Sequence, residues 1–112
     1  MRLSDVTIRE LAAAIDSFVT RRDWKKYHRP KDIAIALSVE ASELLELFLW
    51  KDARNDLSDA DLEKIRMEVA DVAIYALSLA NACGFDLGDA VLRKIALNEA
   101  KYPVENSKDR FG

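Results

Sequence analysis

The chain has 112 residues, half of them hydrophobic and 33% charged, so it is long enough for one domain (residues 1–112) with one modest core. A net charge of −3 argues against a general nucleic-acid binder, and the single cysteine, Cys83, excludes an intrachain disulfide and a cysteine-based zinc site. No apolar run approaches the roughly 20 residues that cross a membrane, and the N-terminus lacks an apolar signal-peptide core, so we expect a cytoplasmic protein without a membrane or nucleic-acid partner.

The apolar periodicity is helical throughout, and it predicts a first helix from about Thr7 to Arg22. Thr7 and Glu10 have the T-x-x-E spacing of a capping box at its start. The predicted buried stripe of this helix consists of Leu11, Ile15, Phe18 and Val19. The polar and aromatic segment 23–30 that follows is predicted to be a loop.

A second helix is predicted from Pro30, whose missing N–H does no harm in a first turn, to about Trp50. A third helix is predicted from Ser58, where a second capping-box pattern stands, to about Ala82. Gly84 follows at the position where a glycine commonly ends a helix.

A fourth helix is predicted from Asp86, which caps it, to Pro103, which stops it, and we expect residues 103–112 to form a mobile tail. The second and third helices are apolar on more than one face, and such helices need more than one packing partner. Four short helices cannot cover both faces in a monomer of this size. The predicted fold is therefore all-α, a four-helix chain that forms an oligomeric helical bundle.

Two acidic pairs stand inside apolar parts of the second and third helices: Glu40 with Glu43, and Glu68 with Asp71. The i, i+3 spacing places both members of a pair on one helical face. Facing pairs in apolar surroundings would repel each other, and a hard divalent cation, Mg²⁺ or Mn²⁺, relieves that repulsion through oxygen ligands. The quartet therefore predicts a metal site for phosphate chemistry.

Two other interpretations of the quartet fit the sequence less well. Most glutamates are solvated surface residues, but this fits poorly with Glu40, which follows IAIALSV, and with Asp71, which lies inside VADVAIYAL. A di-iron carboxylate bundle requires Glu-x-x-His motifs, whereas the one histidine, His28, lies in the predicted loop. An all-oxygen site is favoured.

Polar residues on the fourth helix suit a phosphate chain. Lys94, Asn98 and Lys101 fall at i, i+4 and i+7 and share one face, and Tyr102 follows directly. Two cations and an amide at this spacing can hold a polyphosphate, although an exposed basic face is by itself the commoner case.

Aromatic residues suggest a pocket for a nucleobase. Trp24 and His28 lie in the predicted loop, and Tyr75 comes one turn after Asp71 on the acidic face. Stacking on an aromatic ring contributes roughly 1–3 kcal/mol per base. A tryptophan in a loop is also often a small hydrophobic plug, which is the simpler alternative.

The two acidic motifs, together with the segments RDWKKYHRPKDIAIAL, LFLW and KIALNEAKYPV, resemble the all-α nucleoside triphosphate pyrophosphohydrolases of the MazG type. The dCTP pyrophosphatase-like branch is the most similar, and the resemblance covers about residues 8–104. It implies a homo-oligomer, a dimer or tetramer, that uses Mg²⁺ to hydrolyse a (d)NTP to the monophosphate and pyrophosphate. It further implies that dCTP or a modified dCTP is the substrate and that the enzyme cleans nucleotide pools.

The resemblance also assigns roles to individual residues. It implies that the metal is bound by Glu40, Glu43, Glu68 and Asp71. It implies that the phosphates and sugar are contacted by Lys94, Asn98, Lys101 and Tyr102, and that the base is bound by Trp24, His28, Trp50 and Tyr75. The predicted catalytic carboxylates are Glu43 and Glu40, with Glu43 as the general base. Three alternatives stay open: a same-fold pyrophosphohydrolase acting on another nucleotide such as dUTP, a non-catalytic helical interaction module, and a carboxylate-bridged iron protein.

Overall fold

The computed structural model describes residues 5–49 and 57–104, and the structural statements below refer to these ranges. They contain a short 3-10 helix, η2, and four α-helices, with no strand among them. The elements are α1 (Ile8–Arg21), η2 (Lys25–Tyr27), α2 (Pro30–Glu46), α3 (Asp59–Cys83) and α4 (Leu87–Lys101). The predicted all-α class and four helices are confirmed.

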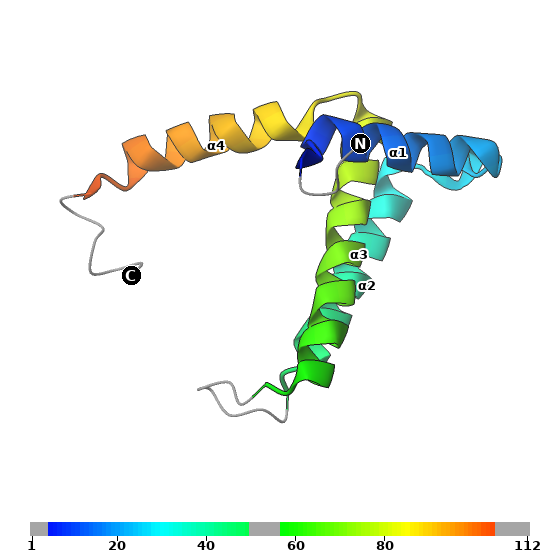
Figure 1. The fold of residues 1–112 in the computed structure, drawn as a ribbon. Helices are drawn as coiled ribbons and strands as arrows, with labels where there is room; N and C mark the ends of the chain where they lie inside the picture. Colours follow the sequence, from blue (N-terminus) through cyan, green and yellow to red (C-terminus); the bar gives the residue numbers. More distant parts are fainter. Residues whose placement is uncertain (1–4, 50–56, 105–112) are drawn as a thin grey trace.

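The four helices do not form a closed bundle within one chain. Figure 1 shows α2 and α3 side by side along their length, with α1 crossing one end of the pair. From that end α4 leads away, and its axis is bent by 101° relative to α3. No single described helix is long and apolar enough to span a membrane, although α3 and α4 pass that test of length and composition as a bent pair.

Capping residues determine where α3 and α4 begin and end. The Ser58 hydroxyl accepts the Asp61 N–H, and the Asp61 carboxylate accepts the Ser58 N–H, which completes the predicted capping box. At the other end of α3, Gly84 has φ +76°, the left-handed conformation that glycine adopts without strain. Asp86 then accepts the Asp89 N–H and begins α4, so these three local predictions are confirmed.

Three details differ from the sequence predictions. At the start of α1, the Glu10 carboxylate accepts the Thr7 hydroxyl (3.1 Å) rather than its backbone N–H, so only the Thr7 half of the capping box forms. The predicted loop 23–30 contains η2. Helix α2 ends at Glu46, earlier than predicted, and the chain continues as turns to 49. No glycine or proline near Glu46 indicated this end in the sequence. Trp50, the predicted end, lies outside the described residues.

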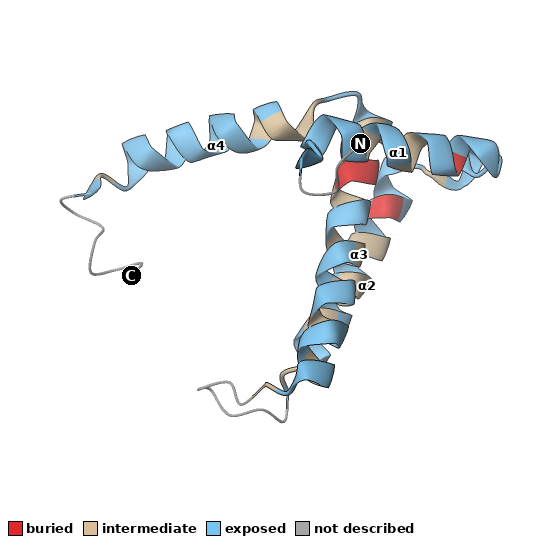
Figure 2. Cartoon of the chain, viewed as in Figure 1, coloured by how far each residue is buried: buried red, intermediate tan, exposed pale blue. Residues whose placement is uncertain are grey.

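The core of the single chain is small. Among the described residues, the buried hydrophobic side chains are Val19, Ile33, Leu77 and Ala80 (Figure 2). The predicted buried stripe of α1 is wrong in part: Val19 is buried, but Leu11 and Phe18 are 37% and 45% exposed. Both line a hollow, which leaves one side of each residue uncovered.

Candidate active site

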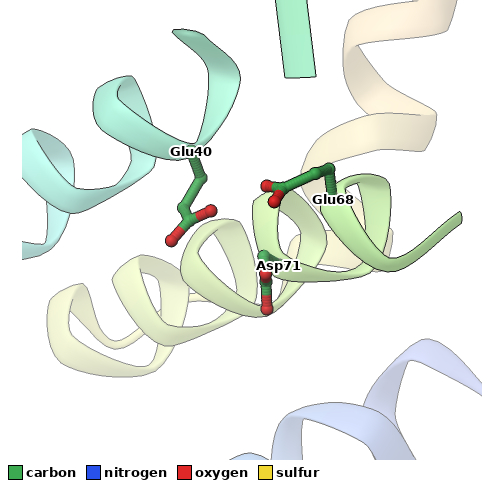
Figure 3. Close-up of side chains that lie close together, drawn as sticks. All are labelled: Glu40, Glu68 and Asp71. Carbon is green, nitrogen blue, oxygen red and sulfur yellow. The ribbon is translucent and has the colours of Figure 1, made fainter. Parts of the chain in front are cut away.

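The packing of α2 against α3 brings carboxylates from both acidic motifs together. Glu40 projects from α2 toward Glu68 and Asp71 on α3 (Figure 3). Each of the three offers a carboxylate oxygen, and these oxygens lie within 4.8 Å of one another. We call these three residues the acidic cluster.

The acidic cluster is electrostatically unfavourable without a counter-charge. One carboxylate oxygen of Glu40 and one of Glu68 are buried and accept no hydrogen bond from a described residue. Burial of the Glu40 carboxylate, and then the nearby carboxylates of Glu68, Glu43 and Asp71, raise its pKa from 4.5 to about 7. The fold thus holds acidic oxygens close together and leaves two of them without a partner.

Glu43 is placed differently from the other three predicted ligands. It is exposed and lies outside the acidic cluster. A step of three residues along a helix moves a side chain about 4.5 Å and turns it about 60°, which explains this offset from Glu40. Glu43 is still close enough for its charge to help raise the pKa of Glu40.

The donor set of the acidic cluster suits a hard divalent cation. Its ligand atoms are carboxylate oxygens, which Mg²⁺ and Mn²⁺ prefer, and the described residues offer no nitrogen or sulfur atom to the group. The two unpartnered buried oxygens are the atoms that a cation would satisfy. The acidic cluster is therefore able to hold a divalent metal ion.

A hollow of about 610 Å³ adjoins the acidic cluster, between α1, the segment 23–30 and α3. We call it the larger hollow. Trp24, His28 and Tyr75, which the sequence predicted for a base pocket, all line it, and Asp71 of the acidic cluster does so too. Its volume falls in the range of small-molecule sites, about 300–1,000 Å³.

Two aromatic rings, those of Phe18 and Trp24, lie in the wall of the larger hollow. The Phe18 and Trp24 rings meet edge to face with centroids 5.8 Å apart. The Arg22 guanidinium lies 3.6 Å from the centroid of the Phe18 ring. Since Phe18 and Trp24 both line the hollow, this edge-to-face pair gives the hollow an aromatic side.

A second, smaller hollow of about 250 Å³ lies next to the first and shares His28 and Ser78 with it. We call it the smaller hollow. Its other polar lining residues are Asp16, Lys25 and Asn81, none of which the sequence predictions included. Part of the signal was in the sequence: Ser78 lies seven residues, about two turns, after Asp71 on α3 and so shares its helical face.

The predicted phosphate contacts do not join this site within one chain. At 1.5 Å per residue, Glu68 lies about 22 Å from the C-terminal end of α3, and Lys94 lies about 10 Å along α4. With the axes bent by 101°, the two residues are roughly 20 Å apart. Asn98, Lys101 and Tyr102 follow still further along α4. Within one chain, therefore, these groups do not reach the acidic cluster, and their predicted contact with the phosphates stays a prediction.

Comparisons with known proteins give consistent results. Residues 35–110, which include all four predicted metal ligands, match the model of the MazG-like family. Over 109 residues the chain is 34% identical to dCTP pyrophosphatase 1 of Bos taurus, covering 94% of this chain and 64% of that protein. It is 35% identical to dCTP pyrophosphatase 1 of Homo sapiens over 102 residues, covering 88% and 60%.

A solved structure supports the fold as well. A pyrophosphatase from Archaeoglobus fulgidus superposes with a TM-score of 0.71 at 35% identity, covering 92% of this chain and 98% of that one. The chain spans less than two thirds of the length of the curated relatives that it matches.

Proposed function

The chain belongs to the MazG-like family, and we propose that it is a Mg²⁺-dependent nucleoside triphosphate pyrophosphohydrolase that cleans nucleotide pools. The proposed substrate is dCTP or a modified dCTP, and the products are the monophosphate and pyrophosphate. The similarity to proteins named dCTP pyrophosphatase 1 supports this choice of substrate.

The observation that carries the proposal is the position of Asp71. This residue belongs both to the acidic cluster and to the lining of the larger hollow. A nucleotide whose base lies against Trp24 and Tyr75 would therefore have its phosphates beside carboxylates that can hold a metal ion. A helical interaction module has no need for this juxtaposition.

The reaction would be attack of water on the α-phosphorus, which breaks the bond to the β-phosphate and releases pyrophosphate. Glu40, Glu68 and Asp71 would hold the metal, with Glu43 close to Glu40. A bound divalent cation supplies neutralisation of negative charge and a more acidic water. Glu43 is exposed and lies outside the acidic cluster, so its carboxylate would be available to accept the proton of the attacking water.

The cationic groups of the site would come from a second copy of the chain. Lys94 and Lys101 are too far from the carboxylates of their own chain, and a leaving pyrophosphate needs neutralising charge. Helix α4 also carries exposed apolar residues that require a packing partner: Val91, Leu92, Ile95 and Leu97, at 48–68% exposure. A homo-oligomer would cover this face and bring Lys94, Asn98, Lys101 and Tyr102 to the acidic cluster of the partner.

A substrate screen tests the proposal. The full chain is incubated with the canonical dNTPs, NTPs and C5-modified dCTPs, with Mg²⁺ and with EDTA, and pyrophosphate and orthophosphate are measured separately. We expect Mg²⁺-dependent release of pyrophosphate and the monophosphate, fastest with dCTP or a modified dCTP. Stepwise release of orthophosphate, or no turnover of any nucleotide, would contradict it.

A further inference from the structure

Helix α4 has little packing within the chain that would fix its direction. None of its residues is buried, and its axis is bent by 101° relative to α3. In the turn between the two helices, the N–H groups of Gly84 and Phe85 donate to carbonyls in the last turn of α3, so these two residues follow that helix. Asp86 is the next residue and the N-cap of α4. The direction of α4 therefore depends on what holds Asp86.

An arginine of α1 holds the Asp86 carboxylate. The Nε and Nη2 atoms of Arg9 each lie 3.1 Å from Oδ2 of Asp86, and the Nε–H donates a hydrogen bond to it. The second oxygen, Oδ1, accepts the Asp89 N–H at 2.8 Å. The contact with Asp89, and then that with Arg9, hold the pKa of the Asp86 carboxyl below its usual range. One carboxylate thus begins α4 and joins it to α1.

Helix α1 is joined to the end of α3 as well. Three residues after Arg9, the Ala12 carbonyl accepts a hydrogen bond from the Asn81 side-chain amide of α3 at 3.0 Å. Arg9 and Ala12 are about one helical turn apart. Helix α1 therefore connects the last turn of α3 with the first turn of α4, and its two contacts fix the bend between these helices.

The absence of a side chain at Gly88 lets α1 approach the start of α4 closely. A Cβ atom at position 88 would lie 3.9 Å from Cβ of Ile8 on α1 and 3.1 Å from Oδ1 of Asp86. The first distance is an ordinary contact, whereas the second is so short that the Asp86 carboxylate would have to move. Glycine at this position therefore leaves the carboxylate where it contacts Arg9.

A small change in the bend would displace the cationic groups of α4 by a large amount. At 1.5 Å per residue, Lys94 lies about 12 Å from Asp86 along α4, and Lys101 lies about 22 Å from it. A rotation of about 5° at Asp86 would move these positions by about 1 Å and 2 Å. A misplacement of about 1 Å can cost roughly 100-fold in rate, even when its cause lies far from the reacting atoms.

We propose that Arg9 and Asp86 are positioning residues for the reaction: their ion pair sets the angle between α3 and α4 and so directs Lys94 and Lys101 to the acidic cluster of the partner. The proposal rests on the proposed function, in which α4 of one copy completes the site of another. The side chains of Arg9 and Asp86 are 80% and 31% exposed. Exposed ion pairs contribute little to stability, so removing this one should leave the fold intact.

Two variants remove the ion pair in different ways. Arg9→Ala removes the guanidinium, and Asp86→Asn removes the charge but keeps an oxygen that can cap α4. Each should lower kcat/KM roughly 10- to 100-fold with little change in melting temperature. The matched control is Arg21→Ala, because Arg21 is an exposed arginine of α1 whose guanidinium bonds the Ser17 carbonyl of its own helix. Wild-type kcat/KM in both variants would overturn the proposal.

Mixed oligomers show which copy the ion pair serves. Refolded together, Arg9→Ala and Glu68→Gln should recover roughly a quarter of wild-type activity, because a mixed dimer has one site with an intact acidic cluster and a correctly directed α4. Arg9→Ala with Lys101→Ala should recover nothing beyond the activity of the separate variants, since every site then receives a damaged α4. An ion pair that only supported the site of its own chain would give the opposite results, and those results would overturn the proposal.

A distance measurement tests the ion pair without catalysis. Spin labels are attached to Lys64→Cys on α3 and Glu99→Cys on α4, both exposed positions, after Cys83→Ser removes the native thiol. Labelled chains are diluted with unlabelled ones so that only distances within one chain are read. We expect one narrow distance distribution, broadened by Arg9→Ala but not by Arg21→Ala, and equal widths in all three would overturn the proposal. If the chain hydrolyses no nucleotide, the proposed function fails, and the distance distributions then decide alone whether the ion pair holds α4.

Discussion

Glu40 on α2 and Glu68 on α3 hold carboxylate oxygens within 4.8 Å of each other, and each has a buried oxygen without a hydrogen-bond partner among the described residues. Like charges at this distance oppose the packing of the two helices. The arrangement therefore lowers the stability of the metal-free protein in exchange for a site that a cation can fill. This relationship leads to the first two predictions.

Glu68→Gln should abolish turnover and stabilise the metal-free protein. The substitution removes one charge from the acidic cluster and keeps its shape, so repulsion falls while a metal ligand is lost. We expect activity with Mg²⁺ to fall by orders of magnitude, and the melting temperature in EDTA to equal or exceed that of the wild type. The matched control is Glu46→Gln, an exposed glutamate outside the cluster on α2, which should change neither quantity. Full activity in Glu68→Gln, or collapse of its metal-free fold, would contradict the ligand assignment.

The stability of the metal-free protein should fall as the pH rises from about 4.5 to above 7. The pKa of Glu40 is about 7 in the folded chain against 4.5 ordinarily, so between these values the folded state binds more protons than the unfolded state. Stability from this group is fully present below pH 4.5 and is lost as the pH passes 7. Melting temperatures across this range measure the effect, and Mg²⁺ should restore stability most strongly at the alkaline end.

Glu40→Gln provides the control for this pH dependence, because glutamine does not titrate. The difference in melting temperature between wild type and Glu40→Gln, both in EDTA, should widen as the pH rises. A difference that stays constant from pH 4.5 to 8 would show that Glu40 does not titrate in this range.

Mixing two inactive variants should restore activity if α4 of one copy completes the site of another. Glu68→Gln damages the acidic cluster and Lys101→Ala damages α4, so a mixed dimer keeps one site with both parts intact. Unfolding and refolding the two variants together should recover roughly a quarter of wild-type activity, since half of the random dimers are mixed and each has one good site of two.

A second mixture controls the complementation experiment. Glu68→Gln with Asp71→Asn should recover nothing, because both changes lie in the acidic cluster and every site then contains one of them. Absence of recovery in the first mixture, or a fully active monomer by light scattering, would sink the shared-site arrangement.

Local chemistry in the sequence predicted the helices well, because helix ends depend on nearby residues. Ser58, Gly84 and Asp86 each satisfy or release backbone groups within a few positions of themselves, so their spacing alone identifies the boundaries. The direction of α4 depends instead on packing. Its apolar residues suggested a helix but not what that helix packs against.

The site was predictable only where it depends on a local sequence motif. Glu68 and Asp71 belong to a recognisable motif, and their closeness to Glu40 follows once α2 and α3 pair. Ser78 and Asn81, which line the smaller hollow, were not predicted. A serine or asparagine within a helix does not indicate a pocket until the packing of the neighbouring helix is known. Only α1, which supplies the Ala12 carbonyl, makes Asn81 a fixed acceptor.

Trp24→Ala should raise KM and leave metal binding unchanged. Trp24 lines the larger hollow beside Phe18 and is not a member of the acidic cluster, so its loss removes base stacking worth about 1–3 kcal/mol and no metal ligand. His28→Ala, at the junction of the two hollows, should alter the ranking of substrates. Steady-state kinetics of both variants with the four dNTPs measure KM and the ranking of substrates. Tyr27→Ala is the aromatic control, since Tyr27 is 64% exposed and lines neither hollow. If Trp24→Ala and His28→Ala keep the wild-type KM and the same substrate ranking, the two side chains only fill space between α1 and α3, and the base binds elsewhere.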